Sequence, residues 1–176
     1  MEFKLRTISK SAIPEAISKV QLYRNLNEPE ESESICHDIL AVEPENQTAL
    51  RQLGLSITDQ FTGHASDRYA EVEGIFEKLT DPFERSYCAG LLYERRAKAQ
   101  LRTGRPPQSL VPWFEKAMRC FEEAEKIAPP SNDDAILRWN RCARILQGLP
   151  GLEEHGEHGF EDHDASPVPD RPTRLK

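Results

Sequence analysis

Basic side chains in two stretches of this chain have the type and spacing that bind anions. Arginine and lysine cluster in 95–102 and again in 138–144, and Arg138 and Arg141 are three residues apart, which places them on one face of a helix. Guanidinium groups hold carboxylates and phosphates through charge-assisted, often bidentate hydrogen bonds. We therefore expect a surface that binds a protein or peptide, with acidic groups favoured, formed by Arg51, Arg95, Lys98, Arg102, Arg138, Asn140 and Arg141.

The same charges have a simpler interpretation, in which they form ion pairs on a helix face exposed to water. Acidic partners are close in the sequence at Glu84, Glu94, Asp133 and Asp134. Exposed ion pairs are common in proteins and contribute little energy. The sequence leaves both interpretations open, and the solvated face is the more ordinary of the two.

The histidines are the other candidates for chemistry. The pair His155-x-x-His158 lies in a glycine-rich, acidic stretch, whereas a catalytic or structural metal site needs ligands that are held rigidly. The sequence contains no phosphate-binding loop, no GxSxG motif and no HExxH motif. We therefore expect no metal site, no cofactor and no enzymatic activity.

The composition favours a helical protein with a thin core and a large surface. Of the 176 residues, 38% are hydrophobic, 30% are charged and only 7% are aromatic. The net charge of -7 argues against general binding to nucleic acid, which requires a basic surface. No apolar run is long enough to span a bilayer, and residues 1–10 lack the apolar stretch of a secretory signal, so we expect no membrane association and a cytoplasmic location.

The four cysteines are expected to be free thiols that pack in the core. Cys36, Cys88, Cys120 and Cys142 are far apart, form no CxxC pair and fall within predicted helices. Buried thiols of this kind behave as small apolar side chains, and a reducing compartment keeps them unpaired. Disulfides and metal ligands are the less favoured interpretations.

Prolines, glycines and capping residues divide the chain into helices. Asn46 is expected to cap a third helix, Ser66 or Asp67 a fourth, and Asn132 a seventh, because their side chains accept hydrogen bonds from unpaired N–H groups. The expected helices cover about 14–25, 29–44, 46–61, 66–82, 84–102, 109–127 and 132–147.

Two spaced patterns of small and apolar residues lie within these helices. The first is Leu50-x-x-Leu53-Gly54-x-x-Ile57, and the second is Ala117-x-x-x-Phe121-x-x-Ala124-x-x-x-x-Pro129. A glycine inside a helix costs about 1 kcal/mol relative to alanine, so Gly54 is expected where another helix comes close, with Ala70 as its neighbour. Ala97 and Ala117 are expected to form the same contact between two later helices, with Phe121 beside them. An ordinary amphipathic hairpin is the alternative.

The two patterns resemble the leading and trailing helices of the tetratricopeptide repeat (TPR) family, and the likeness covers residues 13–146. Stretches 22–50 and 132–146 are also similar to bacterial TPR proteins of uncharacterised role. The resemblance implies an all-α fold, a right-handed α-solenoid of about three helix pairs (13–45, 46–83 and 84–131) with a capping helix at 132–147. Because the third pair exceeds the family's period of about 34 residues, either Leu91-Leu92 or Arg96-Ala97 could occupy the central positions of helix 84–102. We prefer Ala97, with Gly104 at the turn.

The resemblance also implies a function, since TPR proteins generally act as adaptors whose leading helices line a concave groove. The best-known groove of the family clamps a C-terminal carboxylate with lysine and asparagine, whereas this chain has Ile17, Gln21, Arg51 and Gln52 at the corresponding helices, so that specificity is not carried over. We expect a non-catalytic scaffold that binds a peptide or partner segment in such a groove. A self-assembling module with no peptide ligand, such as a homodimer, is the alternative.

The two ends of the chain differ from the helical part. Residues 1–12 are expected to form a flexible arm in which Phe3, Leu5 and Thr7 alternate as in a short strand that could pair with another chain. Residues 148–176 are rich in proline, glycine, histidine and acidic residues, and we expect them to be disordered. Seven acidic and three basic residues give this tail a net charge of -4. It could cover the basic face and compete with a partner, or it could serve only to keep the protein soluble.

Overall fold

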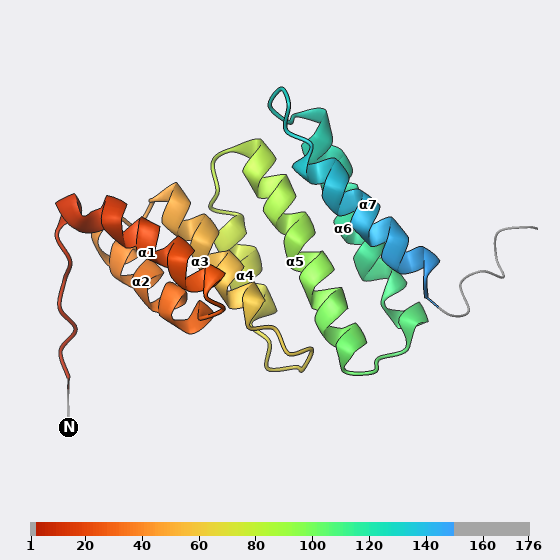
Figure 1. The fold of residues 1–176 in the computed structure, drawn as a ribbon, viewed down its shortest axis with the longest axis horizontal. Coiled ribbons are helices and arrows are strands. Elements are labelled where there is room, and N and C mark those ends of the chain that lie inside the picture. Colours follow the sequence, from red (N-terminus) through yellow and green to blue (C-terminus); the bar gives the residue numbers. More distant parts are fainter. Residues whose placement is uncertain (1–2, 150–176) are drawn as a thin grey trace, which may run out of the picture.

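A computed structural model of the chain describes residues 3–149, and within them the chain forms seven α-helices, two short 3₁₀ helices and no strand (Figure 1). The α-helices are α1 (Ile13–Asn25), α2 (Pro29–Val42), α3 (Gln47–Asp59), α4 (Tyr69–Phe76), α5 (Pro82–Arg102), α6 (Val111–Lys126) and α7 (Asp134–Gln147). The 3₁₀ helices η1 (Lys10–Ala12) and η2 (Pro107–Ser109) precede α1 and α6. The expected all-α class is confirmed for this part of the chain. The tail expected from residue 148 lies outside the described residues from 150 onward.

The helix starts follow simple backbone chemistry. Four helices (α1, α2, α5 and α6) carry proline in the first turn, where its missing N–H costs no helical hydrogen bond. Asn46 caps α3 as expected, because its Oδ1 accepts a bond from the N–H of Ala49 at 3.0 Å. Asp81 caps α5 in the same way by accepting from the N–H of Glu84 at 2.9 Å, so α5 begins at Pro82 and not at residue 84.

The connection between α3 and α4 corrects the expected start of the fourth helix. The carboxylate of Asp67 does not cap α4; it accepts bonds from the N–H groups of Thr62, at 2.9 Å, and Gly63, at 2.8 Å, and so closes the loop. Gly63 has a positive φ of 88°, which an L residue adopts only with strain. The helix begins later, at Tyr69, and is only eight residues long.

The seventh helix covers α6 at the end of the described chain. Its N-cap is Asp133 and not Asn132, one residue later than expected, although the side chain of Asn132 accepts a hydrogen bond from the N–H of Asp134 at 3.0 Å. Trp139 donates a hydrogen bond from its indole Nε1 to Glu122 of α6 at 2.9 Å, and Cys142 of the same helix is buried. This helix therefore packs along α6, the trailing helix of the preceding pair.

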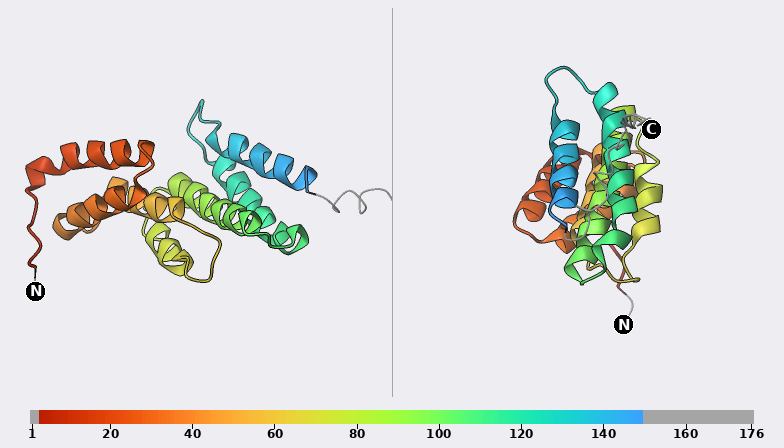
Figure 2. Two further views of the ribbon diagram at one scale, coloured as in Figure 1. Left: turned by 60° about the horizontal axis from the view of Figure 1, so that its bottom comes forward. Right: turned by 90° about the vertical axis from the view of Figure 1, so that its right-hand side faces the viewer.

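The helices form a row in which each one packs against the next in chain order (Figure 1). The odd-numbered helices also meet, since α1 contacts α3 and α3 contacts α5. In the left view of Figure 2, α1 and α7 lie toward one side of the row and α4 toward the other. Polar side chains on the odd-numbered helices can therefore reach one another along the row.

One apolar core runs along the row from Ile13 of α1 to Cys142 of α7. All four cysteines are free, as expected, and Cys36, Cys88 and Cys142 are buried while Cys120 is half-buried. The residues of the two sequence patterns are buried too, with Pro129 as the exception: Leu50, Leu53, Gly54, Ile57, Ala117, Phe121 and Ala124.

Gly54 lies at a close helix contact, but its neighbour is not the expected one. A Cβ atom added to Gly54 would clash with the ring of Phe76 in α4. Ala70, which the sequence analysis placed beside Gly54, is exposed at the start of α4. The prediction of Ala70 is wrong because the later start of α4 moves the contact to the end of that helix.

Gly90 of α5 makes the corresponding contact between α5 and α6. A Cβ atom added there would lie 2.5 Å from Cε1 of Phe121, so the phenyl ring occupies the space that an alanine would need. Ala97 and Ala117 are fully buried, yet the position in α5 that corresponds to Gly54 is Gly90 and not Ala97. The preferred register of the fifth helix is therefore wrong by seven residues, which is about two turns.

Candidate partner-binding face

Polar side chains connect the odd-numbered helices along the row. We call this set the odd-helix face: Arg24, Gln52, Asp59, Glu94, Arg95, Lys98, Arg138 and Arg141. Its members come from α1, α3, α5 and α7, and most are linked by hydrogen bonds or ion pairs.

Asp59 at the end of α3 binds two arginines from different helices. Arg24 of α1 donates from Nε to Oδ2 of Asp59 at 2.8 Å, and also donates to Gln52 at 2.9 Å. Arg95 of α5 donates to Oδ1 of the same carboxylate at 2.5 Å. Asp59 therefore joins α1, α3 and α5 through one carboxylate.

The guanidinium of Arg95 makes its hydrogen bonds to residues at the end of α3. Besides Asp59, its guanidinium donates to the carbonyl oxygen of Leu55 at 3.1 Å and to the hydroxyl of Thr58. Burial lowers the pKa of Arg95, and the charge of Asp59 opposes that effect. The side chain thus satisfies α3 carbonyl and carboxylate groups, and its role in this structure is to hold two helices together.

Glu94, the preceding residue in α5, is a fully buried carboxylate with 0% of its surface exposed. Lys98 contacts its Oε1 at 3.3 Å, and Arg138 of α7 approaches the same atom at 3.6 Å. Its other oxygen, Oε2, is buried and has no hydrogen-bond partner among the described residues. A buried carboxylate oxygen without a hydrogen-bond donor costs free energy. The hydrogen bonding of this face is therefore incomplete at Glu94.

The charges of three cations and of Glu94 act on the pKa of the Cys142 thiol. Burial raises the pKa of Cys142 to about 12, and Glu94 adds to the increase, whereas the charges of Lys98, Arg138 and Arg141 act in the opposite direction. Arg141 is exposed, and no hydrogen bond or ion pair engages its guanidinium within residues 3–149. The junction of α5 and α7 therefore carries three positive charges around one buried negative charge.

Arg138 remains a cation in this setting. Burial acts to lower its pKa, but the negative charge of Glu94 and an interaction with the hydroxyl of Tyr87 outweigh burial and raise it. The guanidinium contacts only one of the two oxygens of Glu94 and is partly exposed. Part of its hydrogen-bonding capacity is therefore available to a bound carboxylate.

The predicted binding residues separate into two groups. Three hold helices together: Arg95 as described, Arg51 by pairing with Glu84 at 2.8 Å, and Arg102 by donating to the carbonyl of Phe61 at 3.4 Å. The other four lie on α5 and α7 and comprise Lys98, Arg138, Asn140 and Arg141. Lys98 and Arg138 approach Glu94, Arg141 is exposed, and Asn140 is half-buried on α7.

The solvated-face interpretation is correct for one ion pair and wrong for the central one. Glu84 pairs with Arg51 in a partly exposed position, as that interpretation requires. Glu94 is not solvated at all, and Asp133 and Asp134 form no ion pair with the basic residues within the described part of the chain. Nearness in sequence explains only the pair of Glu94 with Lys98, four residues apart in α5. Arg138 approaches Glu94 from α7, and Glu84 of α5 pairs with Arg51 of α3.

Arg24, Gln52 and Asp59 were missed as members of this face. Arg24 and Asp59 are 35 residues apart, and Asp59 and Arg95 are 36 apart. These separations are close to the period of about 34 residues of the family that the sequence resembles, and that period is the signal that could have found them.

Comparisons with known proteins add no relative: no family model, no curated protein and no solved structure matches the chain. Within residues 3–149, no helix has both the length and the apolar character needed to cross a membrane. The same residues contain no group of three or more histidine, cysteine, aspartate or glutamate side chains arranged to hold a metal ion.

Proposed function

We propose that this protein is a non-catalytic scaffold that binds an acidic peptide or partner segment at the junction of α5 and α7. The observation that carries the proposal is the approach of Lys98 of α5 and Arg138 of α7 to the buried Glu94, with the exposed Arg141 three residues after Arg138 on the same face of α7. The cations exceed the acid by two charges, so an incoming carboxylate meets a net positive surface.

The row of helices supports a scaffold role. In this row α1 contacts α3 and α3 contacts α5, and Arg138 of α7 approaches Glu94 of α5, so four helices share the odd-helix face, which favours a TPR-like arrangement. In this proposal the helices form a TPR-like α-solenoid of three pairs with α7 as its capping helix. The free state of all four thiols also supports a cytoplasmic location.

The unsatisfied oxygen of Glu94 indicates what else a ligand would supply. Oε2 needs a hydrogen-bond donor, and the backbone N–H groups of an extended peptide are donors. An acidic peptide would place its carboxylates on Arg138 and Arg141 and an N–H group toward Glu94 after a small movement of Lys98. An acidic peptide therefore offers carboxylates to the two arginines and an N–H donor to Oε2 of Glu94.

The test is selection of peptides from a random display library on the full chain, followed by measurement of the dissociation constant by fluorescence anisotropy. Selected peptides should be enriched in aspartate and glutamate, and binding should weaken as salt is added. Replacing Arg141→Glu should weaken binding about tenfold or more, because the ligand then meets a like charge.

The matched control is Lys19→Glu, which reverses the charge of an exposed residue on α1, at the other end of the row from α7 (Figure 1). It should leave the dissociation constant within about twofold, since charges far apart are screened by physiological salt. Peptides without acidic residues, or equal effects of the two reversals, would refute the proposal. A stable assembly that selects no peptide would favour the self-assembling module instead.

A further inference from the structure

The first described residues form an extended arm that exposes two large apolar side chains. Phe3 is 81% exposed and Leu5 is 86% exposed, and residues 3–7 make no hydrogen bond or ion pair with the helices in the described part of the chain. Ile8 anchors the base of the arm by packing against the core, and η1 follows at Lys10. Exposed apolar residues on a chain segment held away from the body are typical of contacts with another molecule.

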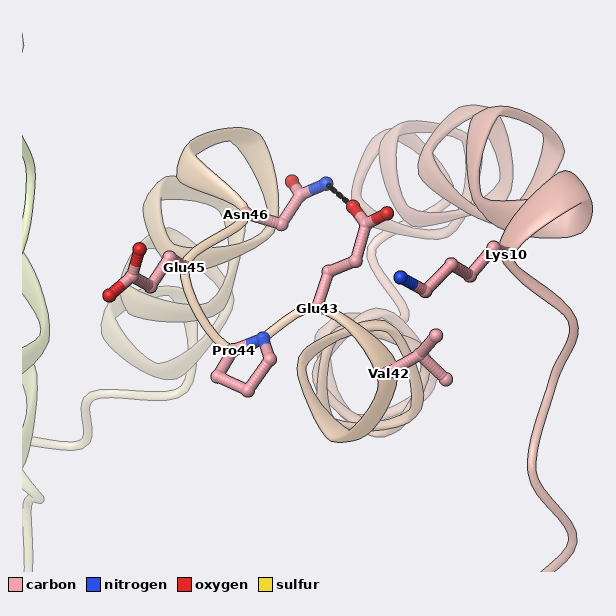
Figure 3. Close-up of a pocket in the computed structure, with 6 residues that line it drawn as sticks. All are labelled: Lys10, Val42, Glu43, Pro44, Glu45 and Asn46. Atoms are coloured by element: carbon pink, nitrogen blue, oxygen red, sulfur yellow. Dashed lines mark hydrogen bonds between the residues drawn. The ribbon is translucent and has the colours of Figure 1, made fainter.

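A shallow depression lies beside the base of this arm. It has a volume of about 530 Å³ and is lined by Lys10 together with the loop between α2 and α3, namely Val42, Glu43, Pro44, Glu45 and Asn46 (Figure 3). A second depression of about 520 Å³ shares Pro44 and Glu45 and adds Leu50 and Lys78. The two adjoin at this loop and offer apolar, acidic and basic side chains.

The arm and the depressions are complementary in chemistry. In the arm, apolar residues alternate with basic ones, as Phe3-Lys4-Leu5-Arg6. In the depressions, Val42, Pro44 and Leu50 are apolar, and the carboxylates of Glu43 and Glu45 share the lining with Lys10 and Lys78. If Phe3 and Leu5 enter the apolar parts, the long side chains of Lys4 and Arg6 reach the carboxylates at the rim.

The arm is poorly placed to enter the depression of its own chain. Ile8 is fixed against the core and Lys10 itself lines the depression, so the arm would have to reverse direction within two or three residues. Residues 3–10 contain no glycine or proline to form so tight a turn. Figure 1 shows the arm running away from the helices.

We infer that two copies of this chain dimerise by exchanging their arms, each arm lying in the depressions beside the α2–α3 loop of the other copy. The arm and its receptor lie at the same end of the molecule, so a twofold axis there lets both arms cross at once and closes the assembly. This surface is at the opposite end of α1 and α3 from Arg24 and Asp59. Dimerisation therefore leaves the odd-helix face open and is independent of the proposed function.

The experiment measures the mass of the full chain by light scattering and its dimer dissociation constant by sedimentation equilibrium. The expected mass is twice 20.1 kDa. Leu5→Asp should raise the dissociation constant at least about tenfold, since it removes a buried leucine and adds a charge beside Glu43 and Glu45. The thermal midpoint of the monomer should not change, because Leu5 makes no contact within one chain.

A charge exchange makes the test specific. Arg6→Glu and Glu45→Arg should each weaken the dimer, and the double variant should restore the dissociation constant to within about threefold of the original. Leu137→Asp, at a leucine of α7 that is 64% exposed, is the control and should leave the dimer intact. The inference is overturned by a monomer at about 200 µM chain, by a dimer insensitive to Leu5→Asp, or by failure of the double variant to restore association.

Discussion

The ring of Phe76 in α4 occupies the space directly beside the α-carbon of Gly54 in α3. Phe121 of α6 has the same relationship to Gly90 of α5. In both helix pairs a glycine on the first helix admits a phenylalanine from the second, which lets the two helices approach closely. This repeated contact is the clearest internal repetition in the molecule.

Replacing Gly54→Ala should destabilise the protein. The added methyl group would overlap the Phe76 ring, and overpacking of this kind costs about 1–3 kcal/mol, more than the gain of up to about 1 kcal/mol in helix propensity. Urea unfolding followed by circular dichroism measures the change. Gly74→Ala in α4 is the control, because nothing lies within 4 Å of the added atom, and it should be neutral or stabilising. Equal effects of the two substitutions would contradict the packing argument.

Asp59→Asn should also lower the free energy of unfolding. It removes the charge that pairs with both Arg24 and Arg95 and leaves the largely buried guanidinium of Arg95 with only neutral partners, a loss of about 1–3 kcal/mol. Unfolding in urea is again the measurement. Glu15→Gln removes an exposed pair with Lys19 and should cost at most about 0.5 kcal/mol. A similar small loss for Asp59→Asn would show that Asp59 does not join the helices.

The stability of the protein should depend on pH through Glu33. Burial acts to raise its pKa, but hydrogen bonds from Arg68 and Gln60 outweigh burial and hold the pKa below the ordinary 4.5. A carboxyl whose pKa is lower in the folded state stabilises that state above the unfolded pKa, and the contribution disappears as the pH falls through the folded value.

Glu33→Gln should therefore lower stability by about 1 kcal/mol at pH 7, and the difference from the original protein should shrink as the pH falls below about 4.5. Thermal unfolding at several pH values measures this difference. The control is Glu115→Gln, an exposed residue of α6, which should leave the pH profile unchanged. A stability difference between the two proteins that grows as the pH falls would contradict the assignment of this pH dependence to Glu33.

Cys120 should react with thiol reagents before the other three cysteines. It is half-buried, and burial raises its pKa to about 11, whereas the buried Cys36, Cys88 and Cys142 each have a pKa of about 12. Because the thiolate is the nucleophile, all four should react more slowly than free cysteine, and faster as the pH rises. Alkylation of the native protein, followed by mass spectrometry of its peptides, orders the four sites. Modification of Cys142 as early as Cys120 would show that α7 detaches from α6.

Local sequence was sufficient to predict most helices and several of their ends. The Asn46 cap, the prolines in first turns and the burial of the three thiols depend on residues within a few positions of one another, so their effect is visible in the chain itself. The start of α4 was not predicted, because Asp67 bonds to the loop at Thr62 and Gly63 in preference to the helix. Both roles suit an aspartate, and only the folded loop selects between them.

The sequence by itself determined that this chain folds into helices with apolar faces and that its basic residues gather in two stretches. The tertiary structure decided which of those residues hold the molecule together. Arg95 is bound to Asp59 of α3, and Arg138 of α7 approaches the buried Glu94 of α5, through contacts between residues on different helices. Such pairings depend on how one helix lies against another, which the Gly54–Phe76 and Gly90–Phe121 contacts set, and helical periodicity within a single segment carries no information about it.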